Sequence, residues 1–301
     1  MADIVPRYAV LFKTHYWDDF VDRRFRHLLD QVGSGDVYVF VDETRGSIGP
    51  IPHDRVIRAT ERDVEKIELL LQPAGNVFWY NADYALYFLL TQDSTYDYYL
   101  MCEYDTVFNI DIDDFITSAA GKRADYVGSP LARSSDWTET CDGVYPESFA
   151  VISWLNAISL HSKRAVAFLY ERRKALTLRY KATEITNWPY SEAFISTEMH
   201  NNDFSVSKLG DYGKVEKFDW WPPTHEKDLS SLQGQQFVHP VLDEQKYIAS
   251  CFKFGRLQTY FWPNGQMRQL LERSSSFSTI PAFLARAFWI EVFRRARRRF
   301  A

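Results

Sequence analysis

The sequence predicts an α/β fold, a mixed, largely parallel open sheet flanked by helices. Two observations near the N-terminus carry this prediction. Tyr8–Thr14 is a near-continuous apolar run, which is typical of a parallel strand buried on both faces. Trp17–Gln31, with apolar residues at helical spacing, then leads into a second strand-like run, Asp36–Val41. Strand, helix, strand is the first unit of a doubly wound sheet.

Length and composition set the domain organisation. The 301 residues are 46% apolar and 16% aromatic, which is enough for a substantial core. We expect one domain over residues 1–273, and a linker with a basic amphipathic helix over 274–301. No stretch is apolar enough to span a bilayer and no secretion signal is seen, so the cytoplasm is the expected location. The 3 cysteines, which lack metal-type spacing, agree with that reducing compartment.

The middle of the chain holds an unusual pair of acids. Within Tyr96–Asn109, an aromatic, strand-forming run ends in Glu103 and Asp105. Residues two apart in an extended segment point to the same side, so both carboxylates should project together from the end of a buried strand. Two anions held that close call for a cation, either a basic side chain or a divalent metal. The alternative is a surface turn with two solvated acids.

The motifs of other nucleotide-binding classes are absent from the sequence. No Gly-x-Gly-x-x-Gly follows the first strand, and no Gly-x-x-x-x-Gly-Lys-Ser/Thr occurs anywhere, so neither a dehydrogenase nor a P-loop NTPase is indicated. The acidic body also argues against a general nucleic-acid binder. If phosphates are bound, a metal must meet most of their charge.

An apolar strand that ends in an acid-x-acid motif, preceded by an aromatic helix and the lead-in Tyr96-Asp97-Tyr98-Tyr99, resembles the GT-A class of nucleotide-sugar glycosyltransferases. The likeness covers roughly the first 240 residues in element order. In that class the motif is called DxD, and its acids hold a Mn²⁺ or Mg²⁺ that bridges the diphosphate of the sugar donor. Here the motif reads Glu103-Tyr104-Asp105, a permitted variant.

The donor site is expected at the carboxyl ends of the strands, where open α/β sheets bind ligands. Thr14, His15 and Asp42 lie at the carboxyl ends of the first two strands. His15 is equally well explained as an ordinary loop histidine. The resemblance adds Tyr104 of the motif itself.

The resemblance also implies donor contacts beyond a third predicted strand, Val77–Tyr80, near a helix over Ala82–Leu90. Asn81 and Asp83 stand where GT-A enzymes contact the base and ribose. Asn81 is also explained as the helix cap, and Asp83 as an acid in the first helical turn.

A late histidine, His239, interrupts the apolar run Phe237–Val241. Some GT-A enzymes supply such a histidine as a further metal ligand, and imidazole with carboxylates suits Mn²⁺. A hydrogen-bonded core histidine is the alternative.

Two further residues are implied by the resemblance or by their setting. Glu192 lies in the first turn of a helix opened by Pro189 and Ser191, where GT-A enzymes place an acid that deprotonates or hydrogen-bonds the acceptor. The helix dipole alone would also favour an acid there. Trp137, in the polar segment Ala132–Gly143, is a candidate to contact an acceptor sugar or to plug the rim of the core.

Elements between these motifs are also predicted. Ile112–Ala119 and Lys163–Tyr180 read as helices, and Asp125–Leu131 as a strand. At the C-terminus, Pro281–Ala301 carries six arginines against a single acid, Glu291, whereas the whole chain has a net charge of −5. Aromatic bulk beside these arginines suits an interfacial anchor on the anionic inner face of the membrane, with docking on protein as the alternative.

Together these features predict a metal-dependent glycosyltransferase of hexosyltransferase type, with Mn²⁺ or Mg²⁺ as cofactor. It would move a sugar from a nucleotide-diphosphate donor, most simply a UDP-sugar, to a hydroxyl of a glycan or glycolipid, as in polysaccharide biosynthesis. The sequence does not decide between inversion and retention. Two alternatives stay open: a non-catalytic nucleotide- or sugar-binding protein on the same fold, and an interaction protein that acts through its basic helix.

Overall fold

The computed structural model describes residues 5–131, 137–256, 259–260, 262, 264–274, 285 and 289. The chain divides into two compact units. The first comprises residues 1–216 and 234–237, and the second comprises 217–233 and 238–301. This division lies inside the predicted domain 1–273 and was not expected from the sequence. Its own boundary at 273/274 stays a prediction, because almost all of 274–301 lies outside the described residues.

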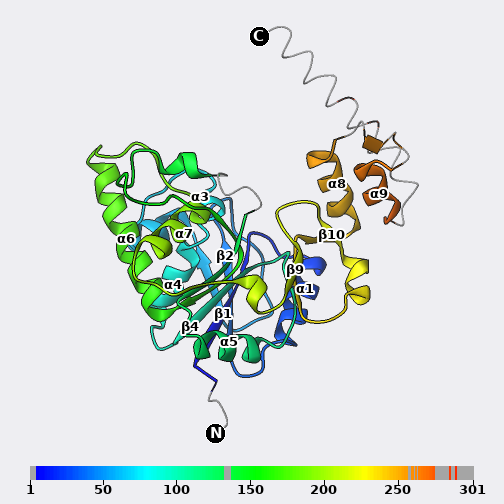
Figure 1. Ribbon diagram of the computed structural model, residues 1–301, viewed down its shortest axis with the longest axis horizontal. Coiled ribbons are helices and arrows are strands. Elements are labelled where there is room, and N and C mark those ends of the chain that lie inside the picture. Colours follow the sequence, from blue (N-terminus) through cyan, green and yellow to red (C-terminus); the bar gives the residue numbers. More distant parts are fainter. Residues whose placement is uncertain are drawn as a thin grey trace. The chain divides into compact units, whose positions relative to one another are not determined.

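The first unit is built on a seven-stranded sheet with the order β3-β2-β1-β4-β7-β6-β8 (Figure 1). Neighbouring strands pair in parallel except on both sides of β7, which runs antiparallel to β4 and β6. The prediction of a mixed, largely parallel open sheet is therefore confirmed. The strands are β1 (Tyr8–Thr14), β2 (Asp36–Asp42), β3 (Val56–Ala59), β4 (Tyr98–Glu103), β6 (Tyr126–Pro130), β7 (Trp154–Ser162) and β8 (Val206–Lys208).

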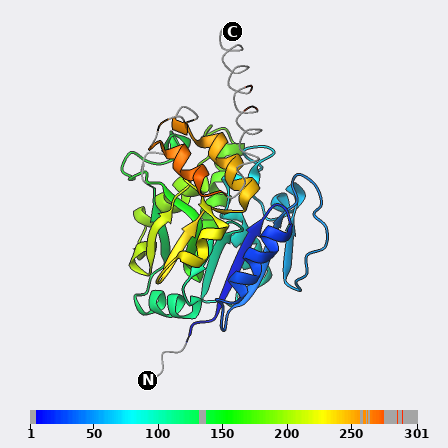
Figure 2. The same cartoon turned by 90° about the vertical axis from the view of Figure 1, so that its right-hand side faces the viewer.

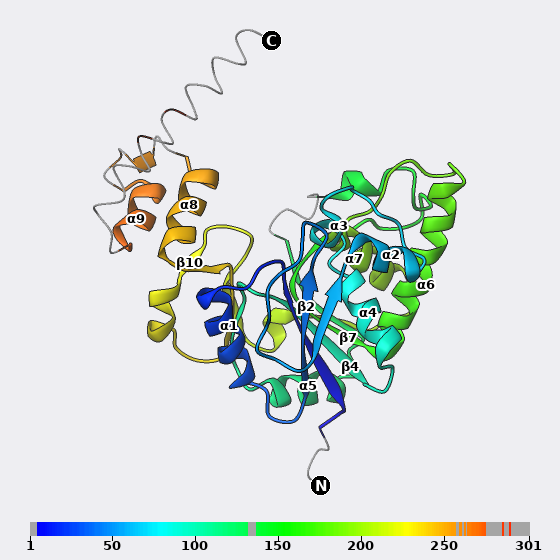
Figure 3. The same cartoon turned by 180° about the vertical axis from the view of Figure 1, so that it is seen from behind.

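Helices flank both faces of this sheet (Figure 3). On one face, α4 (Tyr84–Gln92), α6 (Lys163–Lys181) and α7 (Ser191–Asn201) share the largest core cluster with alternate residues of β1, such as Ala9 and Leu11. On the other face, α1 (Asp19–Leu29) lies over β1 (Figure 2), where the rings of Phe12 and Phe25 are 5.2 Å apart. Strand alternation therefore assigns each residue of β1 to one of two helical layers.

Helix α5 (Ile112–Gly121) belongs to the α1 side of the sheet, because the Tyr8 hydroxyl of β1 donates to Asp113 of this helix. Gly35 leaves room for the same tyrosine. A Cβ atom at position 35 would lie 2.1 Å from the Tyr8 ring, so no larger residue fits there. The short helix α2 (Glu61–Lys66) follows β3 and is capped at Thr60.

One predicted element is wrong. Val77–Tyr80, expected as a strand, forms the short helix α3. Its aromatic residues favour strands, but Phe78 packs against Phe40 at 5.0 Å and Phe88 at 5.9 Å, and this tertiary packing decides the conformation. The expected helix cap at Asn81 is wrong for the same reason, because Asn81 ends α3 and α4 begins only at Tyr84.

A smaller sheet has the order β5-β11-β9 and contains β5 (Val107–Asn109), β11 (Gln236–His239) and β9 (Lys214–Phe218). Strand β5 and the first two residues of β11 belong to the first unit. The ring of Phe237 in β11 lies 5.9 Å from Phe108 of β5 and 5.6 Å from Phe115 of α5. These contacts anchor β11 to the strand that follows the acidic motif.

The second unit has a small core of its own. It contains the two-stranded parallel sheet of β10 (Thr224–His225) and β12 (Val241–Leu242), with helices α8 (Glu244–Phe254) and α9 (Gln266–Glu272). Tyr247 and Cys251 of α8 pack with Leu270 of α9, and the Tyr247 hydroxyl donates to the Leu270 carbonyl at 2.9 Å. Of the helices that the structure describes, none combines the length and apolar character needed to cross a membrane. The predicted helix over 281–301 lies outside the described residues, except for residues 285 and 289.

Candidate metal centre and adjoining cavity

Glu103, the last residue of β4, faces a lysine of the neighbouring strand. Strands β1 and β4 pair in parallel with Lys13 opposite Glu103, so both side chains leave the sheet on the same face. Lys13 Nζ lies 3.0 Å from Glu103 Oε1, and the lysine is only 8% exposed. The lysine therefore compensates part of the negative charge at the end of β4.

The second acid reaches the site through a turn. Strand β4 ends at Glu103, and Thr106 donates to the Glu103 carbonyl both from its backbone N, at 3.1 Å, and from its hydroxyl, at 2.7 Å. Asp105 lies inside this turn. The expectation that strand alternation would align the two carboxylates is therefore wrong, because the extended conformation does not continue past Glu103.

His239, the last residue of β11, has one ring nitrogen engaged. His239 Nδ1 lies 2.8 Å from the Asp219 carbonyl oxygen. A carbonyl only accepts, so Nδ1 carries the proton in this hydrogen bond and Nε2 is the unprotonated nitrogen of the neutral ring. Metal-binding histidines in proteins are commonly held in this manner, with one N–H donated to a backbone carbonyl.

Glu103, Asp105 and His239 form a cluster that could hold a metal ion. One ligand atom from each residue lies within 4.8 Å of the other two. Ligand atoms on one ion at 2.0–2.2 Å are at most about 4.4 Å apart, which is close to the spacing in this cluster. Two carboxylates and an imidazole suit Mn²⁺, and Mg²⁺ accepts the carboxylates. The residues therefore fit the predicted ion.

A cavity of about 450 Å³ opens beside this cluster, at the carboxyl ends of β1, β2 and β4. Five of the predicted site residues line it: Thr14, His15, Asp42, Glu103 and Tyr104. The remaining lining residues are Lys13, Arg45, Gly46, Ser47, Ile48, Asn76, Phe78, Trp79 and Tyr80. The cavity thus mixes aromatic rings with charges of both signs, as expected for a polar ligand that also carries a flat ring.

The lining residues are held by local contacts. The Thr14 hydroxyl donates to the Tyr16 carbonyl at 2.6 Å, and Asp42 accepts from both the backbone N and the hydroxyl of Thr44. The His15 ring lies 5.4 Å from the Tyr104 ring, edge to face. Burial lowers the pKa of His15, and the nearby Asp42 opposes that shift only in part. The imidazole is therefore neutral near pH 7 and can accept as well as donate a hydrogen bond.

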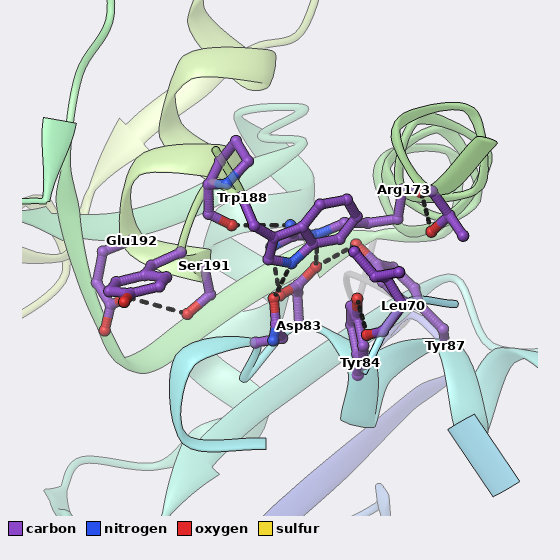
Figure 4. A network of polar contacts seen from close by, with 12 residues as sticks. Leu70, Asp83, Tyr84, Tyr87, Arg173, Trp188, Ser191 and Glu192 are labelled. Carbon is purple, nitrogen blue, oxygen red and sulfur yellow. Dashed lines mark hydrogen bonds and ion pairs between the residues drawn. The ribbon is translucent and has the colours of Figure 1, made fainter. Parts of the chain in front are cut away.

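Asn81 and Asp83 are placed elsewhere. Both are completely buried, and neither lines the cavity. The Asn81 amide donates to the carbonyls of Gln72 and Val77 and accepts from the Trp188 indole. Asp83 forms a buried ion pair with Arg173, at 2.7 and 3.0 Å (Figure 4). The structure thus gives both residues partners inside the protein, away from the expected donor contacts.

Glu192 lies in the first turn of α7, and its surroundings change the pKa of its carboxyl group. It follows Ser191, whose hydroxyl donates to Glu192 Oε2 at 3.0 Å (Figure 4). Burial raises the pKa of Glu192 to about 7, and repulsion from Glu103 adds to the shift. Glu192 therefore lies within electrostatic range of Glu103, although it is not among the residues that line the cavity. Glu198, further along α7, pairs with Arg172 at 3.1 Å instead.

Trp137 is 41% exposed and lies beside the cavity-lining Tyr80, with ring centres 6.5 Å apart. Lys13, Arg45 and Trp79 are three of the lining residues that were not predicted. Lys13 could have been found, because it is the single charge within the otherwise apolar run of β1. Arg45 and Trp79 carry no such signal, because the turn after β2 and the short helix α3 bring them to the cavity.

No protein-family model matches the chain, and no curated protein matches it. The class of fold and site is therefore defined by the residues that the structure describes. They form a mixed α/β fold with a largely parallel sheet and a Glu-Asp-His cluster that could bind a metal, an arrangement compatible with the GT-A fold.

Proposed function

We propose that this protein is a metal-dependent glycosyltransferase that takes its sugar from a nucleotide-diphosphate donor, most simply a UDP-sugar. One observation carries the proposal: Glu103 belongs to the metal cluster and also lines the cavity at the carboxyl ends of β1, β2 and β4. A ligand in this cavity would therefore lie next to an ion held by Glu103. Open α/β sheets bind ligands at this edge.

The ion, when bound, would neutralise the charge that builds up on the leaving diphosphate. Glu103, Asp105 and His239 would hold it. Lys13 and Arg45, which both line the cavity, add positive charge for the phosphate oxygens. Trp79 and Tyr104 offer aromatic faces for the nucleobase.

Glu192 would act on the acceptor. With a pKa of about 7, this carboxyl is half ionised near neutral pH, which suits a group that removes a proton from an attacking hydroxyl. This role belongs to an inverting reaction. In a retaining reaction no such base is required, and Glu192 would hydrogen-bond the sugar.

A thermal-shift experiment tests the donor site. The midpoint of unfolding is measured with UDP, GDP and CDP, each with and without Mn²⁺. A ligand that binds only the native state at a hundredfold excess over Kd adds about 2.7 kcal/mol of stability. We expect a metal-dependent rise with one nucleotide, UDP first, in the wild type, and little or none in Asp105→Asn.

The matched control is Asp19→Asn, which removes the same charge from an exposed position in the first turn of α1. It should respond to nucleotide and metal as the wild type does. A folded wild type that shifts with no nucleotide would refute the glycosyltransferase and favour an interaction protein. Metal-dependent nucleotide binding without turnover of any nucleotide sugar would instead favour a non-catalytic binding protein.

A further inference from the structure

Three aromatic side chains from separate parts of the chain gather beside the cavity. We define them as the aromatic platform: Tyr80 at the end of α3, Trp137 before the 3₁₀ turn Thr138–Cys141, and Tyr190 before α7. The Tyr190 ring lies 4.2 Å from Tyr80 and 5.6 Å from Trp137, centre to centre. The platform is accessible to solvent, since Trp137 is 41% exposed.

The platform is fixed by one hydroxyl. Thr140 Oγ1 donates to the Trp137 carbonyl at 2.6 Å and accepts from the backbone N of Tyr190 at 3.2 Å. The backbone N of Thr140 donates to the same Trp137 carbonyl at 3.1 Å. Thr140 therefore ties together two of the three aromatic residues, which lie 53 positions apart in the chain.

The backbone at Trp137 is itself unusual. Its φ of 67° lies in the left-handed region, which bulky residues seldom adopt. An uncommon conformation persists where the surroundings enforce it, and such positions gather at functional sites. Here the enforced conformation belongs to the residue that presents an exposed indole.

The platform adjoins the residues proposed to carry the chemistry. Tyr80 lines the cavity, together with the 59% exposed Trp79. Tyr190 stands two positions before Glu192, at the start of α7. A ring that lies on the platform therefore borders the cavity, and the start of α7 carries both Tyr190 of the platform and the proposed base.

We infer that the aromatic platform binds a pyranose ring of the acceptor, with Thr140 as the positioning residue. One face of a pyranose exposes C–H bonds, which pack well on the electron-rich face of an aromatic ring. The hydroxyls at the rim of the sugar would meet the polar groups of the cavity. The identification of this sugar as the acceptor rests on the proposed function. Saccharide binding by the platform can be measured on its own.

Saturation-transfer NMR tests the platform directly. The probes are the methyl α- and β-glycosides of glucose, galactose, mannose and N-acetylglucosamine, added to the full-length protein with UDP and Mn²⁺. We expect transfer to the C–H protons of at least one glycoside. In Trp137→Ala the transfer should be weaker by at least about fivefold, since a stacked aromatic face is lost.

Thr140 is tested by a pair of variants. Thr140→Val keeps the shape and removes the hydroxyl, so glycoside binding should weaken, whereas Thr140→Ser keeps the hydroxyl and should restore it. The matched control is Trp220→Ala, which removes another exposed tryptophan, 53% accessible, from the second unit. It should bind glycoside as the wild type does.

The outcomes separate the two proposals. If Trp137→Ala binds glycoside as the wild type does, or if no glycoside binds to a protein that responds to UDP and Mn²⁺, the platform is refuted and the donor site stands. If a glycoside binds at the platform while no nucleotide binds, the platform is a saccharide site and the transferase is refuted. A Trp137→Ala variant that changes only the oligomeric state would show that the platform is an interface between copies of the chain, which also refutes the inference.

Discussion

At the scale of single residues, Glu192 makes the stability of the fold depend on pH. Its pKa rises from 4.5 in the unfolded chain to about 7 in the folded protein. Between these values the native state holds a proton that the unfolded state has lost, so stability falls as the pH rises and levels off above about 7. The shift corresponds to at most about 3 kcal/mol.

Glu192→Gln removes this titration. The variant should match the wild type below about pH 4 and become more stable than it by up to about 3 kcal/mol at pH 8. Urea unfolding across this range measures the difference. Glu147→Gln, at an exposed position, is the control and should follow the wild type at every pH. A constant difference between Glu192→Gln and the wild type from pH 5 to 8 would show that Glu192 does not titrate in this window.

The candidate site was predictable only in part, and single residues show why. Glu103 and Asp105 were found because two carboxylates stand at the end of an apolar strand, and His239 because the resemblance to GT-A enzymes implies a late histidine ligand. Asp83 has the same chemistry, yet it is explained by Arg173, 90 positions away. A pairing at that separation leaves no local signal in the sequence.

At the scale of elements, the buried ion pair between Asp83 and Arg173 joins α4 to α6 (Figure 4). Arg173 also donates to the Pro189 carbonyl at 2.8 Å, and the Tyr87 hydroxyl donates to Asp83 at 2.8 Å. Both charged side chains are 0% exposed, so each depends on the other. The contact to Pro189 places the start of α7, and with it Glu192.

Removing one partner should cost far more than removing both. Arg173→Met leaves a buried carboxylate without its cation, and we expect a loss of about 3–5 kcal/mol. Asp83→Asn with Arg173→Met keeps an acceptor for Tyr87 and should recover most of that loss. Urea midpoints of the two single variants and the double variant measure the coupling. Additive losses would contradict the idea that the two charges stabilise each other.

Elements with strong periodicity were predicted closely. Strand β1 matches its expected range, Tyr8–Thr14, and α6 extends only one residue beyond the expected Lys163–Tyr180. Failures concentrate in short elements. Strand β5, of three residues, and β8, also of three, are too brief to show a period. Helix α3 shows that four aromatic and β-branched residues can be turned into a helix by their packing.

At the scale of the whole molecule, charge is unevenly distributed along the sequence. The net charge of −5 includes six arginines over 281–301, so the remainder is more acidic than the total. We propose that this basic segment binds anionic lipid surfaces, to which clustered arginines and aromatic residues are suited.

Sedimentation with liposomes tests this proposal. The full chain should sediment with vesicles of phosphatidylcholine and phosphatidylserine, and less so as salt is raised, because the attraction is screened. Deletion of 276–301 should abolish the association. Vesicles of phosphatidylcholine alone are the control. Equal sedimentation of the full and the shortened chain would remove the lipid surface as a partner.

The ion pair between Lys13 and Glu103 also bears on the order in which ligands arrive. A lysine 3.0 Å from one of three metal ligands acts as an internal counter-ion, and it competes with any divalent ion for the same carboxylate. A diphosphate in the cavity would offer Lys13 another anion and release Glu103. Metal and nucleotide would then strengthen each other's binding by the same factor, since such coupling is reciprocal. The lysine would thus make the capture of an ion depend on the anion bound in the cavity.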